Sequence, residues 1–204
     1  FIVYFLVNNY TLTKEKILIF IGSFLILAIG LVDDFYKSRG KEFPIYPRLI
    51  IQLIAAFIIY NAGIVFRGFT NPFTGNYIVL SSFVQFILTI TWIFGVTTVI
   101  NWSDGMDGLA GGLSLISSIT FAGAAIILKQ SESITMSLIV SGVTLGFLKY
   151  NNYPAKIFMG DSGANFLGFI LSIIALDGAF KQATLMSIFI PCLLYTSPSP
   201  RDRT

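Results

Sequence analysis

The sequence predicts an all-α fold, a polytopic transmembrane helical bundle with about seven spans. Hydrophobic residues make up 55% of its 204 residues and charged residues only 11%, whereas an ordinary soluble domain carries about 25% charged residues. Apolar stretches close to the ~20 residues that a helix needs to cross a bilayer recur along nearly the whole chain. We therefore expect a lipid bilayer to surround most of the protein.

Seven apolar windows are the expected spans. They cover residues 17–32, 49–66, 83–100, 109–128, 135–148 and 165–176, and a seventh begins at residue 183. The sixth window is short and can extend through the glycine-rich residues before it. We expect residues 1–192 to form one integral membrane domain that is truncated at both ends, and residues 193–204, which abandon the membrane pattern, to be a non-native tail.

Alternation of these spans across the bilayer places the loops 33–48, 101–108 and 149–163 on one side. This side carries six Lys and Arg residues against five on the other, so the positive-inside rule names it cytoplasmic. Because an Asp at the centre of a spanning helix costs roughly 2.5–3.5 kcal/mol, the membrane edge is the expected place for acids. Five aspartates fall on this side: Asp33, Asp34, Asp104, Asp107 and Asp161.

Composition also excludes several classes of function. A net charge of +3 without a cluster of Lys or Arg gives no surface for nucleic acid. The single cysteine, Cys192, excludes an internal disulfide and a cysteine metal site. Histidine is absent, so acid, base or metal chemistry must come from carboxylates, amides, Lys or Tyr.

Three short polar clusters carry the candidate chemistry: "DDFYK" (33–37), "NWSDGMDG" (101–108) and "FMGDSGAN" (158–165). Solvated loop acids are the ordinary alternative, but acids gathered at one membrane edge favour a function. Carboxylates that share a site either bind protons more tightly or take up a cation. Mg²⁺ suits such oxygen ligands and is commonly held by one or two carboxylates together with substrate phosphates.

Spacing within the clusters adds two expectations. On a helix, Asn101, Asp104 and Asp107 would spread over about 120° of one face and could converge on one ligand. Lys37 could supply a point charge to a phosphate. The glycine pairs 108/112 and 142/146 fit the spacing of helix-packing contacts.

The stretches "LVDDFYKSRGKEFP", "VINWSDGMDGLAGG" and "YNNYPAKIFMGDSGANFLG" together resemble the polyprenyl-phosphate N-acetylhexosamine-1-phosphate transferases. These bacterial enzymes begin wall teichoic acid, O-antigen and peptidoglycan lipid intermediates. The resemblance covers about residues 17–190 and implies a transferase at the cytoplasmic face of the bacterial plasma membrane. It further implies Mg²⁺, with Mn²⁺ as an alternative, a UDP-sugar and undecaprenyl phosphate as substrates, and UMP as a product.

The resemblance also implies roles for individual residues. Catalytic roles fall to Asp33, Asp34 and Asp104, substrate contacts to Lys37 and Asp107, and metal contacts to Asn101 and Asp161. Asp33 and Asp34 match paired acids near the lipid phosphate, and Asp107 matches a position near the uracil. Because the second pKa of a phosphate is about 6, the attacking phosphate is already ionised at neutral pH. We therefore expect direct attack rather than a covalent aspartyl intermediate.

Several alternatives stay open at this stage. The donor is expected to be UDP-GlcNAc, with the UDP-MurNAc-pentapeptide of peptidoglycan synthesis as the alternative. A histidine-containing loop that helps these enzymes recognise the sugar is missing, so we expect this fragment alone to be inactive. A homodimer is compatible with the sequence. An ion-coupled transporter would place its acids near the bilayer midplane in repeated halves, and a CDP-alcohol phosphotransferase would need an Arg that "DGLAGG" lacks.

Overall fold

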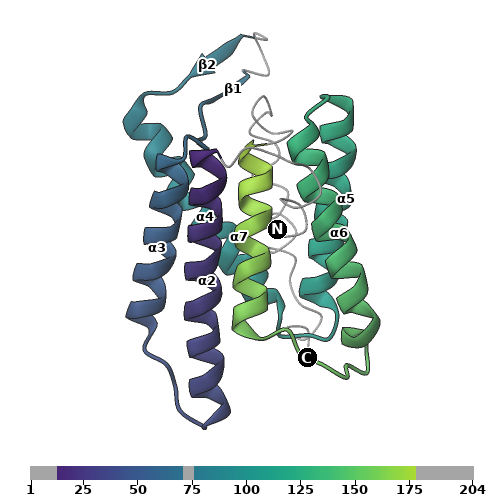
Figure 1. The fold of residues 1–204 in the computed structure, drawn as a ribbon. Coiled ribbons are helices and arrows are strands. Elements are labelled where there is room, and N and C mark those ends of the chain that lie inside the picture. Colours follow the sequence, from purple (N-terminus) through teal and green to yellow (C-terminus); the bar gives the residue numbers. More distant parts are fainter. Residues whose placement is uncertain (1–12, 71–75, 178–204) are drawn as a thin grey trace, which may run out of the picture.

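A computed structural model describes residues 13–70 and 76–177, and this part of the chain forms a bundle of six helices and one short hairpin (Figure 1). The helices are α2 (Lys14–Ser38), α3 (Ile45–Asn61), α4 (Ser82–Ser103), α5 (Leu109–Ile127), α6 (Ser131–Asn151) and α7 (Gly160–Asp177). Each of the first six predicted windows overlaps one of these helices, so the predicted all-α bundle is confirmed. The window from residue 183 and the expected tail lie outside the described residues.

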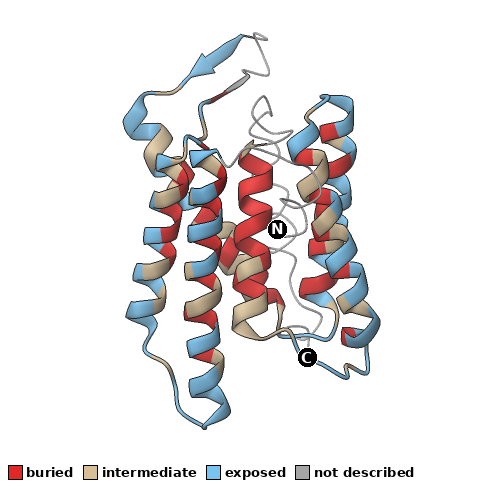
Figure 2. Ribbon diagram, viewed as in Figure 1, coloured by how far each residue is buried: buried red, intermediate tan, exposed pale blue. Residues whose placement is uncertain are grey.

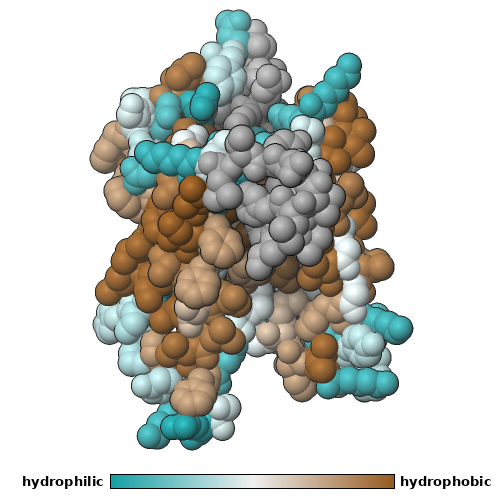
Figure 3. Space-filling model, viewed as in Figure 1, coloured by the Kyte–Doolittle hydropathy of each residue, from teal (hydrophilic) through white to brown (hydrophobic). Residues whose placement is uncertain are grey.

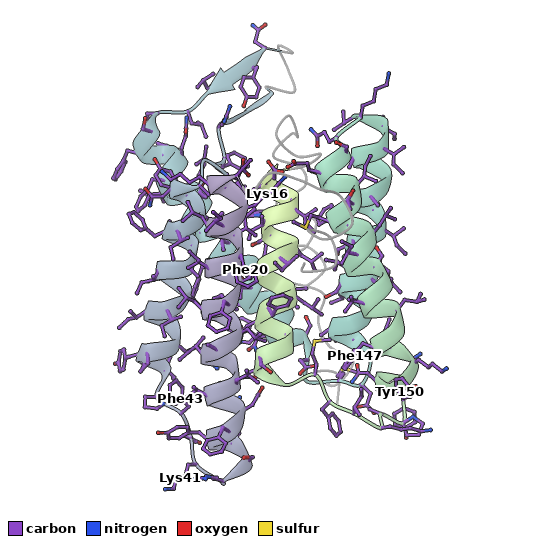
Figure 4. The ribbon with its side chains drawn as sticks, viewed as in Figure 1. Lys16, Phe20, Lys41, Phe43, Phe147 and Tyr150 are labelled. Carbon is purple, nitrogen blue, oxygen red and sulfur yellow. The ribbon has the colours of Figure 1, made fainter. Side chains whose placement is uncertain are left out.

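Four of the described helices, α2, α4, α5 and α6, are long and apolar enough to cross a membrane. Helix α3 is apolar but has 17 residues. Apolar side chains cover the middle of the visible face and polar side chains gather at its two ends (Figure 3). Lys16 lies near one end of the bundle and Lys41 at the other (Figure 4). This banding is what an integral membrane protein requires.

Helix α7 is the centre of the bundle. Every residue from Leu167 to Leu176 is buried, and Figure 2 shows α7 as the helix with the longest buried stretch. It packs mainly against α2 and α4. A helix that is apolar all round is expected in such a core position, and its glycine-rich start belongs to the same helix, as the sequence predicted.

Small residues let the helices approach α7 closely. A Cβ on Gly168 would lie 2.8 Å from the Cα of Thr97 on α4, and one on Gly30 would lie 2.4 Å from the Cα of Ser162. The predicted packing pairs were mostly wrong, because no described atom lies within 4 Å of a Cβ built on Gly112, Gly142 or Gly146. The contact between α5 and α6 uses another glycine, because a Cβ on Gly111 would lie 2.9 Å from Leu148 Cδ2, and it also uses serines, with Ser141 Oγ donating to Ser118 Oγ at 2.9 Å.

The ends of the helices differ from the predicted windows in one important way. Helix α2 continues six residues past its window, so Asp33, Asp34 and Lys37 lie on a helix and not in a loop. A helix of 25 residues is about 37 Å long, which exceeds the ~30 Å hydrocarbon core of a bilayer. The last turn of α2 can therefore carry charge outside the apolar layer.

The three predicted same-side loops do meet at one end of the bundle, because the C-terminal ends of α2, α4 and α6 lie beside the start of α7 (Figure 1). The opposite end carries an antiparallel hairpin of β1 (Gly68–Thr70) and β2 (Tyr77–Val79), which the sequence analysis did not predict. At that end Lys16 of α2 also pairs with Glu132 of α6 at 2.9 Å.

Candidate active site

Helices α2 and α7 bring three of the predicted acids together. Lys37 Nζ on the last turn of α2 donates to Asp161 Oδ2 at 2.5 Å and lies 3.5 Å from Asp33 Oδ2. Arg48 Nη1 on α3 donates to the same two oxygens, at 3.0 Å for Asp33 and 3.2 Å for Asp161. Two carboxylates from different helices thus share two cations.

Lys37 and Arg48 compensate the negative charge of Asp33, which is only 2% exposed. A charge removed from water is tolerated when it is paired and hydrogen-bonded. Arg48 offers a planar, permanently charged guanidinium that matches carboxylate oxygens. Its place on α3 fixes the distance between α2 and α3 at this end of the bundle.

Asp34 has a different task, because it caps the N-terminus of α7. Its Oδ1 accepts the backbone N–H of Asp161 at 2.8 Å and its Oδ2 accepts that of Ser162 at 3.0 Å. The first N–H groups of a helix lack partners within the helix, and a carboxylate also complements the positive end of the helix dipole. Gly160 precedes these residues with φ +69°, a conformation that a side chain would strain. Asp34 therefore sets where α7 begins.

Asn101 and Asp104 border the cluster from the end of α4. The Nδ2 of Asn101 is buried and has no hydrogen-bond partner among the described residues. The pKa of Asp104 is raised from 3.8 to about 6, mainly by burial and also by the negative charges of Asp161 and Asp34, while a hydrogen bond from the amide of Gly160 acts in the opposite direction. Asp104 thus faces the uncompensated negative side of the cluster.

Helix α4 ends at Ser103, so Asn101, Asp104 and Asp107 do not share one helical face. Asp107 lies in the turn before α5 and accepts the backbone N–H of Ala155 through Oδ2 at 3.0 Å. Asn151 supports the same loop, since its Nδ2 donates to the carbonyl of Ile157 at 2.9 Å and its Oδ1 accepts the N–H of Gly108 at 3.1 Å. Asp107 therefore helps to hold this loop, and within the described part of the chain it forms no hydrogen bond or ion pair with the acid cluster.

Three residues of this site are not among the predicted site residues. Arg48 enters the sequence prediction only as a loop charge, and Gln52 and Asn165 have no role in it. Gln52 Nε2 donates to Asn165 Oδ1 at 3.1 Å, and Asn165 Nδ2 donates to the carbonyl of Asp161 at 2.8 Å. A signal was present, because residues 48 and 52 and residues 161 and 165 are both polar pairs spaced four apart, the spacing of neighbours on one helix face.

Comparisons with known proteins identify the family of the chain. A family model described as glycosyl transferase family 4 matches residues 16–179. The chain belongs to glycosyl transferase family 4. The matched range contains all of the predicted site residues and also Arg48, Gln52 and Asn165.

Named relatives of this family 4 chain come from several bacteria. It is 41% identical over 178 residues to a probable undecaprenyl-phosphate N-acetylglucosaminyl 1-phosphate transferase of Bacillus subtilis (strain 168), covering 87% of this chain and 48% of that protein. It is 33% identical over 206 residues to a phospho-N-acetylmuramoyl-pentapeptide-transferase of Prochlorococcus marinus (strain MIT 9312), covering 93% and 56%. With the corresponding enzyme of Enterococcus hirae the identity is 35% over 155 residues, covering 73% and 47%. The chain spans about half the length of these relatives.

The geometry of this family 4 chain bears on metal binding. No group of three or more acidic, His or Cys side chains suited to a metal ion occurs within residues 13–70 and 76–177. The donor chemistry still fits Mg²⁺, because the cluster offers oxygen ligands and Mg²⁺ is commonly held by only one or two carboxylates with water and phosphate completing its shell. A cation beside Asp104 would offset the negative charges of Asp161 and Asp34, which act on this carboxyl.

Proposed function

We propose that the protein from which this chain comes transfers GlcNAc-1-phosphate from UDP-GlcNAc to undecaprenyl phosphate and releases UMP. The observation that carries the proposal is the meeting of acids and cations from several helices at one polar end of an apolar bundle. A water-soluble nucleotide sugar and a membrane lipid can both reach such a place. The name of the Bacillus subtilis relative supports undecaprenyl phosphate as the acceptor and GlcNAc-1-phosphate as the transferred group.

The reaction is a displacement at phosphorus. A phosphate oxygen of the lipid attacks the sugar-bearing phosphorus of the UDP-sugar, and the bond from that phosphorus to the bridging oxygen breaks. UMP departs with the bridging oxygen, and a lipid-linked sugar diphosphate remains. Catalysis of this step rests on positioning and on charge stabilisation.

The contacts of the paired acids support direct attack. Both oxygens of Asp34 hold backbone amides of α7, and Asp33 Oδ2 faces Arg48 and Lys37. An acid with these tasks is a poor candidate for a covalent nucleophile. We assign Asp33 and Asp34 to holding the cluster together, and Lys37 and Arg48 to meeting the phosphates of the substrates.

Asp161, Asn101 and Asp104 are the residues that would hold Mg²⁺, with Mn²⁺ as an alternative. The cation would offset the charge between the two phosphate groups that must approach each other. Asp104 forms no ion pair within the part of the chain that the structure describes, which leaves its carboxylate available for this role. The site faces the cytoplasm in this proposal, as the distribution of Lys and Arg predicts.

A transferase assay on the complete gene product in detergent tests the proposal. The assay measures UMP release with undecaprenyl phosphate and either UDP-GlcNAc or UDP-MurNAc-pentapeptide, before and after chelation and with Mg²⁺ or Mn²⁺ restored. We expect release with UDP-GlcNAc, loss on chelation, and loss in Asp161→Asn. Asp177→Asn, the same change at the other end of α7, is the matched control and should stay active.

The other outcomes of this assay are equally informative. Release with the MurNAc donor alone would replace the proposed donor, in line with the names of the Prochlorococcus and Enterococcus relatives. Release from neither donor in a folded protein would overturn the proposal. Full activity of Asp161→Asn would remove the acid cluster from the mechanism.

A further inference from the structure

We propose that Gln52 and Asn165 are positioning residues that hold Asp161 in its working place. This inference rests on the proposed function, and it concerns two side chains that lie outside the charged cluster. Neither is expected to touch substrate. Their effect would come through the backbone of the first turn of α7.

The two residues form the second rung of a polar ladder between α3 and α7. The first rung is Arg48 to Asp161 at 3.2 Å, and the second is Gln52 to Asn165 at 3.1 Å. Within each helix the two rungs are four residues apart, which places the second about one turn, or about 6 Å, from the first. Rotation or sliding of α7 against α3 would break both rungs together.

The direction of the hydrogen bonds fixes both amide groups. Asn165 Nδ2 faces the carbonyl of Asp161 at 2.8 Å, and a carbonyl can only accept, so the Oδ1 of Asn165 must face α3. Gln52 must then offer its Nε2 as the donor. Each donor in this series therefore points the same way, from Gln52 on α3 to Asn165 and from Asn165 to the backbone carbonyl of Asp161.

Burial argues that this rung does more than fill space. Gln52 is 7% exposed and Asn165 is 1% exposed, in a core whose apolar side chains are mostly Ile, Leu, Ala and Phe. Two apolar side chains of similar shape could pack there with no need for partners. A polar rung also specifies one position of α7 along α3, because a shift of α7 would leave the buried side-chain amides of Gln52 and Asn165 without hydrogen-bond partners.

The decisive experiment separates stability from positioning. Asn165→Leu leaves the amide of Gln52 buried and unpaired, whereas the double variant Gln52→Leu/Asn165→Leu removes both polar groups. We expect the unfolding temperature in detergent to fall in the single variant and to recover in the double variant. If the rung positions Asp161, kcat for UMP release stays about 10- to 100-fold low in the double variant while KM changes little.

Recovery of both the unfolding temperature and kcat in the double variant would overturn the inference. Thr144→Val is the matched control, since Thr144 is 1% exposed and its hydroxyl donates to carbonyls of α6 alone. It removes a buried polar group on a helix that contributes no residue to the ladder, and it should leave kcat unchanged. A wild-type protein that releases no UMP would instead count against the proposed function.

A second readout needs no activity. The change in unfolding temperature caused by Asp161→Asn is measured in the wild type and in the Gln52→Leu/Asn165→Leu background. If the rung holds Asp161 against Arg48, the two effects are non-additive and the fall is at least about halved in that background. Equal falls in the two backgrounds would show that Asp161 is placed without the rung.

Discussion

Gly30 of α2 offers the sharpest test of how the cluster is held. A Cβ at this position would lie 2.4 Å from the Cα of Ser162 and 2.8 Å from its backbone nitrogen. Both are backbone atoms at the start of α7, so no side-chain rotation can relieve the contact. Because carbon atoms are in favourable contact at about 3.5–4.0 Å, Gly30→Ala must push α2 and the first turn of α7 apart by about 1 Å.

The structure gives the size of the effect. A separation of about 1 Å would stretch the two bonds from Asp34 to the amides of Asp161 and Ser162, now 2.8 and 3.0 Å, beyond the 2.7–3.2 Å of an N–H···O hydrogen bond. Overpacking of this kind costs about 1–3 kcal/mol, and the lost cap adds about 1 kcal/mol. A displacement of about 1 Å at a reacting group can lower the rate about 100-fold.

Thermal unfolding in detergent and UMP release by the complete gene product measure the two effects. We expect Gly30→Ala to unfold several degrees lower and to lose most of its kcat. Gly142→Ala on α6 is the matched control, because no described atom lies within 4 Å of its added Cβ, and Ala is favoured over Gly within a helix by about 0.5–1 kcal/mol. Wild-type stability and rate in Gly30→Ala would refute the idea that this close approach sets the position of Asp161.

Three further predictions concern single acids. Asp34→Ala removes the cap of α7 and should lower the free energy of unfolding by about 1–2 kcal/mol; Asp34→Asn, which keeps one acceptor oxygen, should lose less in the same denaturation measurement. The pKa of Asp104 is raised from 3.8 to about 6, so the folded state binds this proton more tightly and stability falls as the pH rises from about 4 to 6. Asp104→Asn should remove this pH-dependent loss of stability. In the presence of a chelator, the unfolding temperature of Asp104→Asn minus that of the wild type should therefore increase as the pH rises from about 4 to 6. A difference that stays constant over this range would contradict the raised pKa of Asp104. Asp107→Ala frees the amide of Ala155, and hydrogen exchange at that amide should accelerate while the unfolding temperature changes little, since an exposed hydrogen bond contributes about 1 kcal/mol or less.

Hydropathy could predict the helices because the apolar windows directly report which residues avoid water. It could not predict where α2 ends. Asp33, Asp34 and Lys37 close the apolar window, but backbone hydrogen bonding continues through them because their charges find partners on α3 and α7. The hairpin was missed since its strands have three residues each, too few for an alternating pattern to register.

The site could be predicted in part. The alternation of spans was enough to place Asp33, Asp34 and Asp161 at one end, and the structure brings them together. Asp34 caps α7, whereas Asp33 and Asp161 pair with cations. This difference depends on how the helix ends pack against each other, which the sequence pattern does not show. The spacing of three residues suggested that Asp107 joins Asn101 and Asp104, but the chain turns at Gly105 and sends Asp107 toward Ala155.

The cap of α7 has a consequence for the biogenesis of the protein. Asp34 and the two amides that it accepts are separated by 127 and 128 residues, and α7 is the last of the described helices to leave the ribosome. Until α7 is synthesised, Asp33 and Asp34 of α2 lack their partners on that helix. The acid cluster can therefore form only after the other five described helices have been made. The site is therefore completed late in membrane insertion. Its formation requires that α2 and α7, which are distant in the sequence, have packed against each other.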